Sequence, residues 1–141
     1  MKNTPRLVPL LLRAAHGIRQ AHDRVCHAHG LTFQQFNVLR ILAGAERNGD
    51  DPLPTMEIAR RLVEPGPGIT RFIKQLRERG LINVQPNPAD ERSRLCALTE
   101  TGRAELRRIE PAITALAGEL FKELDPAAHR ELKALLDRIQ Y

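Results

Sequence analysis

Three side chains that can donate hydrogen bonds to a polyanion recur at helical spacing. Thr70, Arg71 and Lys74 fall on one face of a helix that the sequence predicts to begin at Pro67 and to end at Gly80. A hydroxyl, a guanidinium and an ammonium group suit phosphate oxygens and the edges of bases, and an arginine can bind a guanine with two hydrogen bonds. The opposite face of this helix is apolar, carrying Ile69, Phe72, Ile73 and Leu76. We therefore expect a helix that is anchored on one side and reads the major groove of DNA on the other.

A second basic group follows in a short polar segment. Asp90, Arg92 and Arg94 lie where we predict a β-hairpin with a projecting tip. We expect the carboxylate of Asp90 to orient the guanidinium of Arg92, and Arg92 or Arg94 to enter the minor groove. The alternative is a surface ion pair worth only about 0 to 1 kcal/mol. The complete set of expected DNA contacts is Pro67, Gly68, Thr70, Arg71, Lys74, Gln75, Arg92 and Arg94.

The surrounding sequence predicts a helix, a turn, a helix and a hairpin between residues 53 and 102. Thr55 is expected to cap the first of these helices, and the turn is expected at residues 64–68 because Pro and Gly alternate there. Pro67 suits the first position of the second helix. Strands are expected at residues 81–85 and 93–98, joined by a tip at residues 86–91. This order is typical of a winged helix-turn-helix.

The segments before and after this region are helical in pattern. Residues 5–29 carry apolar side chains at intervals of four and three, with Pro9 expected to delay or bend the start and Gly30 expected to end the helix. Thr32, with Gln35 three residues later, predicts the start of a helix that ends before the polar residues 46–51. Leu53 can then form a short edge strand.

From Thr101 the pattern predicts an amphipathic helix of about 22 residues, loosened at Pro111. Asp125 and Pro126 are expected to start a last, leucine-rich helix. A chain of this size offers too few apolar partners for its terminal helices. We therefore expect them to interdigitate with the same helices of a second copy.

The composition fits one small domain with a polyanionic partner. The chain has 141 residues, of which 42% are hydrophobic, 28% charged and 4% aromatic, and its net charge is +5. No apolar run approaches the ~20 residues that cross a bilayer, and no cleavage signal follows the apolar residues 7–12. We therefore expect a cytoplasmic protein that does not enter the membrane.

Other functional classes receive less support. The sequence lacks a P-loop, a GxSxG motif and a GxGxxG motif, so we expect neither an enzyme nor a bound cofactor. Cys26 and Cys96 are expected to be buried thiols, with peroxide sensing by Cys26 as the alternative. Four histidines near the start, at positions 16, 22, 27 and 29, have no zinc-site spacing, so no metal site is expected although metal sensing stays an alternative. A winged helix that binds protein instead of DNA is a further alternative.

The order of parts resembles the MarR family of bacterial transcription regulators. The resemblance covers nearly the whole chain and rests on GITRFIKQLRERGLI in the second helix of the helix-turn-helix, Asp-x-Arg-Ser at 90–93, Leu-Thr-x-x-Gly at 98–102 and Leu-Asp-Pro at 124–126. It implies a homodimer that binds a palindromic operator on double-stranded DNA, and a repressor that a small organic effector releases. Two departures are Val84 and Gln85, where the family commonly has arginine, and Glu91 in the middle of the wing motif.

The resemblance also implies an effector crevice between the DNA-binding and dimerisation regions, for which His16, His22 and Phe36 are candidates. The expected fold is mainly α with a small β-hairpin wing, in a single domain spanning 1–141. Residues 32–100 would form the winged helix-turn-helix lobe, and residues 5–30 and 101–141 would form the dimerisation helices.

Overall fold

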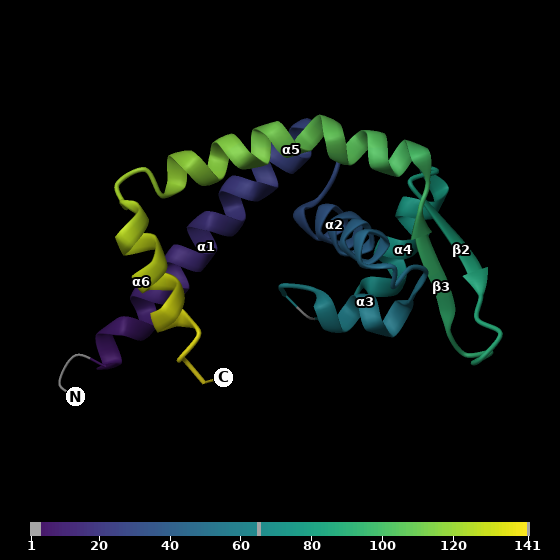
Figure 1. Ribbon diagram of the computed structural model, residues 1–141, viewed down its shortest axis with the longest axis horizontal. Helices are drawn as coiled ribbons and strands as arrows, with labels where there is room; N and C mark the ends of the chain where they lie inside the picture. The colour runs from purple at the N-terminus through teal and green to yellow at the C-terminus, as the bar shows by residue number, and fades with distance from the viewer. Residues whose placement is uncertain (1–3, 65, 141) are drawn as a thin grey trace.

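The computed structural model describes residues 4–64 and 66–140. Its elements are α1 (Thr4–Ala28), α2 (Phe33–Asn48), β1 (Leu53–Pro54), α3 (Thr55–Arg61), α4 (Ile69–Glu78), β2 (Ile82–Pro86), β3 (Arg94–Leu98), α5 (Glu100–Leu120) and α6 (Pro126–Leu136). Figure 1 shows α5 arching over the molecule, with α1 and α6 below one end and α2, α3, α4 and the sheet below the other. Both ends of the chain lie on the side of α1 and α6.

Helix α1 begins earlier than expected and passes through Pro9 without interruption. The expectation that Pro9 would delay its start was wrong, because a single proline near a helix start removes only one backbone hydrogen bond. The helix ends as predicted. Gly30 adopts a φ of 73°, and the N–H of Leu31 donates to the carbonyl of Cys26 at 3.0 Å.

The predicted capping box opens α2. The Thr32 hydroxyl accepts a hydrogen bond from the Gln35 N–H at 3.1 Å, and the Gln35 Oε1 accepts one from the Thr32 N–H at 3.0 Å. The helix continues through residues 46–48, which the sequence placed in a polar connection, and ends at Gly49. This extension brings Glu46 within reach of α5, where it forms contacts described below.

Thr55 does not cap α3, contrary to prediction. Pro54 occupies the N-cap position, and the Thr55 hydroxyl donates instead to the carbonyl of Arg94 at 3.3 Å. The reason is that β1 runs directly into α3, so that Thr55 already lies beside β3. Among the apolar residues of α3 and its C-terminal end, Ile58 and Leu62 are buried and Ala59 is half-buried.

Pro67 precedes α4 instead of forming its first residue. Gly68 is the N-cap with a φ of 116°, a value that favours glycine, and the first backbone bond joins the Phe72 N–H to the Gly68 carbonyl at 3.0 Å. The turn between α3 and α4 lies where predicted, although its member Pro65 falls outside the described residues. Helix α4 ends before Gly80, whose φ is 71°.

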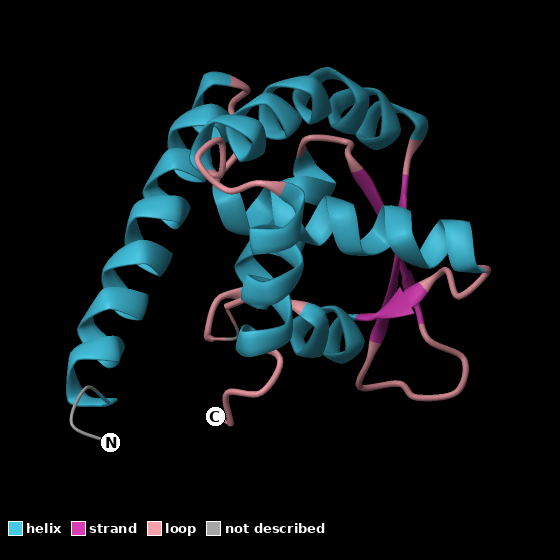
Figure 2. Cartoon of the chain, turned by 60° about the vertical axis from the view of Figure 1, so that its left-hand side comes forward, coloured by secondary structure: helices cyan, strands magenta, loops and turns pink. Residues whose placement is uncertain are grey.

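The three strands form an antiparallel sheet in the order β1-β3-β2. Ile82 pairs with Leu98 and Pro86 pairs with Arg94, so that β2 begins one residue later than predicted and the tip comprises residues 87–93. Cys96 and Leu98 point into the core, while Leu95 and Ala97 on the other face of β3 are half-buried. Figure 2 shows the sheet beside the helices, with the tip projecting beyond them.

The core lies in the lobe formed by α2, α3, α4 and the sheet, and α5 covers it. Fully buried side chains include Phe36, Leu39, Leu42, Ile58, Leu76, Ile82 and Ile109.

Helix α5 is 21 residues long and continues through Pro111, and Leu124 lies beyond its end. The Asp125 carboxylate caps α6 as predicted by accepting from the Ala128 N–H at 2.8 Å. Ile139 lies beyond α6.

The terminal helices leave apolar side chains exposed. Large exposed hydrophobic residues on α1 are Leu7, Val8, Leu10, Leu11 and Leu12, and those on or after α6 are Leu135, Leu136 and Ile139. No side chain of α6 is buried. Among the described helices, none combines the length and the apolar character that a membrane span requires.

Candidate nucleic-acid interface

The exposed face of α4 carries the side chains that the sequence assigned to it. Thr70, Arg71 and Lys74 are exposed, while Ile73 and Leu76 on the opposite face are buried. The guanidinium carbon of Arg71 lies 5.5 Å from the centre of the Phe72 ring. The Lys74 Nζ lies 3.9 Å from Glu78 Oε1, at the edge of ion-pair range. The helix is therefore held by its buried face, and its exposed face carries cationic groups that can meet an anionic surface.

The backbone conformation before α4 requires glycine at position 68. Its positive φ strains any other residue, and a Cβ atom at this position would lie 3.5 Å from the Phe72 ring. Pro67 is exposed beside it. These two residues set the direction in which α4 leaves the turn, and both lie at the end of α4 that we expect to enter the groove.

Gln75 points away from the other residues predicted to contact DNA. Its Oε1 accepts a hydrogen bond from Gln35 Nε2 at 2.8 Å, and Gln35 is buried in the capping box that begins α2. Gln75 thus connects α4 to the start of α2. The sequence assigned Gln75 to the groove because it follows Lys74, but its angle around the helix turns it towards the lobe.

The wing tip is closed by hydrogen bonds between residues that are close in sequence. Asp90 Oδ1 accepts from the backbone N–H of Arg92 at 3.0 Å, and the Ser93 N–H donates to the Asp90 carbonyl at 3.0 Å. The expected pairing of Asp90 with the Arg92 guanidinium was therefore wrong, because the carboxylate is taken up by the turn itself. Asp90 still has a structural role, because it accepts this hydrogen bond from the backbone of the turn. Arg92 and Arg94 are exposed on the tip and at the start of β3.

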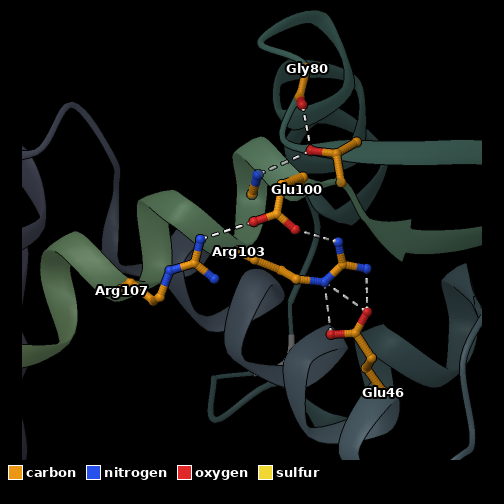
Figure 3. A network of polar contacts seen from close by, with 7 residues as sticks. Glu46, Gly80, Glu100, Arg103 and Arg107 are labelled. Carbon is orange, nitrogen blue, oxygen red and sulfur yellow. Dashed lines mark hydrogen bonds and ion pairs between the residues drawn. The ribbon is translucent and has the colours of Figure 1, made fainter.

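Figure 3 shows a network of polar contacts that fixes the start of α5 against α2 and the end of α4. Arg103 Nε lies 2.9 Å from Glu46 Oε1, and Arg103 Nη1 lies 3.2 Å from Glu100 Oε2. Arg107 binds the other Glu100 oxygen at 2.9 Å. The Thr99 hydroxyl donates to the Gly80 carbonyl at 2.6 Å and accepts from the Gly102 N–H at 3.0 Å. The helix that leaves the wing is thus attached to the two helices behind it.

The ion pairs of this network lower the pKa of both carboxyl groups. The hydrogen bonds from Arg103 lower the pKa of Glu46 below its usual 4.5. Those from Arg107 and Arg103 do the same for Glu100. A carboxyl group whose pKa is lower in the folded state stabilises the fold above its unfolded pKa, and this contribution disappears as the pH falls through the folded value.

We therefore expect Arg103→Gln to lower the free energy of unfolding more at about pH 7 than at about pH 3, where the carboxyl groups become protonated. Urea denaturation of both proteins across this range, at one protein concentration, measures the difference. A penalty that does not change with pH would show that Arg103 acts by packing and not through its ion pairs with Glu46 and Glu100.

Both cysteines are buried, as predicted. Burial, with the nearby Asp23 carboxylate, raises the pKa of Cys26 to about 11. Burial also raises the pKa of Cys96, against a smaller opposing effect of the Thr55 hydroxyl. Since the thiolate is the reactive form, these surroundings suppress the chemistry on which a peroxide sensor depends.

We expect neither thiol of the native protein to react with an aromatic disulfide reagent at about neutral pH, and both to react in denaturant. Absorbance of the released thiolate measures the reaction. Rapid reaction of the native protein, lost in Cys26→Ser, would contradict this expectation and support the alternative of thiol sensing.

The residues proposed for an effector crevice do not form one site. Phe36 is fully buried in the core of the lobe, so its placement in an open crevice was wrong. His22 is half-buried, donates from Nδ1 to the Ile18 carbonyl at 2.8 Å and lies 4.9 Å from the Phe33 ring centre. His16 is exposed on α1 and bonds Arg19. Across residues 4–64 and 66–140, no group of three His, Cys, Asp or Glu side chains gathers closely enough to hold a metal ion.

Two positioning contacts of this interface could not be read from the sequence. Gln35 was identified as a capping residue, but its bond to Gln75 joins residues 40 positions apart. Glu46 and Arg103 are 57 positions apart. Glutamate and arginine are common on helix surfaces, so no local pattern marks the pair that will meet.

Comparison with known proteins agrees with this geometry. The sequence profile of the MarR family matches residues 29–93. The transcriptional activatory protein BadR of Rhodopseudomonas palustris is 31% identical over 122 residues, covering 85% of this chain and 68% of BadR.

Two solved structures share the whole architecture. A cysteine-to-serine mutant of MarR from E. coli, complexed with operator DNA, is 25% identical with a TM-score of 0.83, covering 99% of this chain and 96% of that one. BpsR of Bordetella bronchiseptica, whose DNA binding is regulated by 6-hydroxynicotinic acid, is 25% identical with a TM-score of 0.80, covering 94% of this chain and 97% of that one. They confirm the predicted fold class, and the chain belongs to the MarR family of transcription regulators.

Proposed function

We propose that this regulator binds palindromic double-stranded DNA as a homodimer, with α4 in the major groove and the wing in the minor groove. The observation that carries the proposal is the division of α4 into a buried apolar face and an exposed face with Thr70, Arg71 and Lys74. Pro67 and Gly68 lie at the leading end of α4, and Arg92 and Arg94 lie on the wing. Gln75 has a positioning role in this proposal, through its bond to Gln35.

The proposed dimer buries the exposed leucines of α1 and the apolar side chains of α6 against their counterparts in a second copy. Residues 5–30 and 101–141 would form this dimerisation region, and residues 32–100 would form the DNA-binding lobe. Helix α5 belongs to both regions, because Leu106 and Ile109 are buried in the core of the lobe while the helix extends to α6. A change in the packing of α5 would therefore move the lobe.

The proposed activity is repression in the cytoplasm, released by a small organic effector. Repression requires only that the bound dimer exclude other proteins from the operator, whereas activation needs an additional contact surface. The regulation of BpsR by 6-hydroxynicotinic acid supports effector control in a neighbour of the same fold. The MarR complex with operator DNA supports the mode of DNA binding.

Selection of bound sequences from a pool of random duplexes tests this function with the purified full chain. We expect enrichment of an inverted repeat whose half-sites are about one helical turn apart, since two related α4 helices would read it. Enrichment of a single unrepeated site would contradict the symmetric dimer. Binding without any sequence enrichment would contradict a sequence-specific regulator.

Arg71→Ala is expected to relax sequence choice. If the guanidinium binds a base edge, its loss should cost about 1 to 3 kcal/mol at one base pair of each half-site, with little change on random DNA. Anisotropy titrations against the selected duplex and against single-base variants measure this. Equal losses on the selected and random duplexes would show that Arg71 contacts phosphate only.

A further inference from the structure

A cavity lies on the side of α2 that faces away from Gln35. Its volume is about 330 Å³, and it is lined by side chains from α2, from the end of α3 and from α5. Asn37, Arg40 and Arg47 reach it from α2, Arg61 from α3 and Glu110 from α5. None of these residues is among those that we assign to DNA binding, and His16, His22 and Phe36 do not line the cavity.

The charges around the cavity favour an anion. Three arginines line it against the single carboxylate of Glu110. Arg61 is already paired with Glu57, its Nε lying 2.7 Å from the carboxylate oxygen. Within the described part of the chain neither Arg40 nor Arg47 forms an ion pair. Both guanidinium groups can therefore bind an additional carboxylate.

Asn37 supplies an independent indication of a ligand. Only 4% of this residue is exposed, and its Nδ2 has no hydrogen-bond partner among the described residues. A buried donor without an acceptor is unfavourable, so such groups are rare unless another molecule satisfies them. Arg40 is three residues further along α2 and therefore lies beside Asn37 on the same face. An amide donor and a guanidinium side by side match the two oxygens of one carboxylate.

The rest of the lining indicates what the carboxylate carries. Ile41, Ala43 and Val63 provide aliphatic surface, and no aromatic side chain lines the cavity. Val63 is 72% exposed, which leaves apolar surface for a ligand to cover. Inorganic phosphate would satisfy the cationic groups but would leave this surface uncovered.

We propose that this cavity binds a small organic monocarboxylate with an aliphatic body, whose carboxylate contacts Asn37 Nδ2 and the guanidinium of Arg40. Arg47 adds positive charge, and Ile41 and Val63 contact the aliphatic part. Because the cavity joins α2 and α3 of the lobe to α5, the bound ligand bridges the two regions whose relative position sets the spacing of the α4 helices. Only this regulatory consequence rests on the proposed function, since ligand binding itself does not require DNA.

Calorimetric titration of the full chain without DNA tests the site, with sodium hexanoate as the probe. Hexanamide, which is uncharged and of similar size, and inorganic phosphate serve as comparison ligands. We expect saturable binding of hexanoate with a Kd of about 1 mM or tighter, and binding of the other two at least about tenfold weaker. No saturation by hexanoate, or equal affinity for hexanamide or phosphate, would overturn the proposal.

Variants place the binding in this cavity. Asn37→Asp and Arg40→Gln should each weaken hexanoate binding by about tenfold or more, whereas Arg24→Gln, which removes an exposed arginine from α1, should leave it unchanged. Asn37→Leu should also weaken binding while maintaining or raising the thermal midpoint, because it removes the unpaired donor. Unchanged affinity in folded Arg40→Gln and Asn37→Leu proteins would overturn the assignment. DNA titrations with and without hexanoate then test regulation separately.

Discussion

Gly102→Ala is expected to lower the free energy of unfolding by about 3 kcal/mol, the upper end of the usual cost of overpacking, because the added methyl group overlaps backbone atoms. A Cβ atom at Gly102 would overlap the backbone carbonyl of Leu81, and it would lie 3.1 Å from the Leu81 carbonyl carbon and 3.2 Å from a Leu98 methyl carbon. The carbonyl belongs to the segment that joins α4 to β2, and it also accepts a hydrogen bond from the Thr99 N–H. Relief of the overlap would therefore separate α5 from the wing.

Gly118→Ala is the matched control, since Gly118 lies in the same helix and a Cβ atom there would have no neighbour within 4 Å. In a single chain it should stabilise α5 by about 0.5 to 1 kcal/mol, the usual difference between alanine and glycine in a helix. Urea denaturation at fixed protein concentration compares the two variants with the original chain. Similar effects of the two substitutions would contradict the close contact at Leu81.

Arg92→Ala is expected to weaken operator binding by about tenfold or more, corresponding to a loss of at least ~1.4 kcal/mol, while the dimer stays folded. Arg92 is exposed on the wing tip, and its backbone N–H is held by Asp90 at 3.0 Å. The turn at the tip therefore holds the backbone of Arg92 in place. Among the described residues, no acidic side chain forms an ion pair with the Arg92 guanidinium. An arginine held in this way suits the negative potential of a narrow minor groove.

Anisotropy titration with the selected duplex measures the loss, and circular dichroism confirms the fold. Arg108→Ala removes the same charge from α5, outside the wing and α4, and should change affinity much less. Equal losses for the two variants would mean that only net charge matters. Unchanged affinity of a folded Arg92→Ala protein would remove the wing from the interface.

Local patterns predicted most of the fold. The capping box of Thr32 and Gln35 and the cap at Asp125 depend on residues three positions apart, and the structure contains both. The buried face of α4 followed from helical periodicity. Such features lie within one or two turns of the chain, where the sequence determines which residues meet.

The predictions that were wrong depend on contacts or backbone geometry that local sequence patterns do not reveal. Thr55 has the residue type of a helix cap, but β3 lies close enough to accept its hydroxyl. Pro67 suits a first helical position, yet the positive φ of Gly68 moves the start of α4. The placement of Phe36 in a crevice was wrong because its burial depends on the packing of the whole lobe, which no local pattern reveals.

The candidate site divides in the same way. Periodicity identified the exposed Thr70, Arg71 and Lys74, but the orientation of Gln75 depends on Gln35, which comes from a different helix. The cavity at Asn37 could not be predicted, because three helices form it and the unpaired amide becomes evident only when its neighbours are known. The DNA contacts assigned to α4 and the wing stay predictions, which the DNA-binding experiments test.

The most direct test of the central claim is the number of chains that bind one operator duplex. Sedimentation equilibrium of the purified chain, alone and with a fluorescent duplex carrying the selected inverted repeat, measures it at moderate ionic strength. We predict a dimer in both cases, with two chains on each duplex, because α1 and α6 expose the apolar surface that a second copy would bury. A monomer in free solution that also binds the duplex as one chain, or no binding to the duplex, would contradict the account.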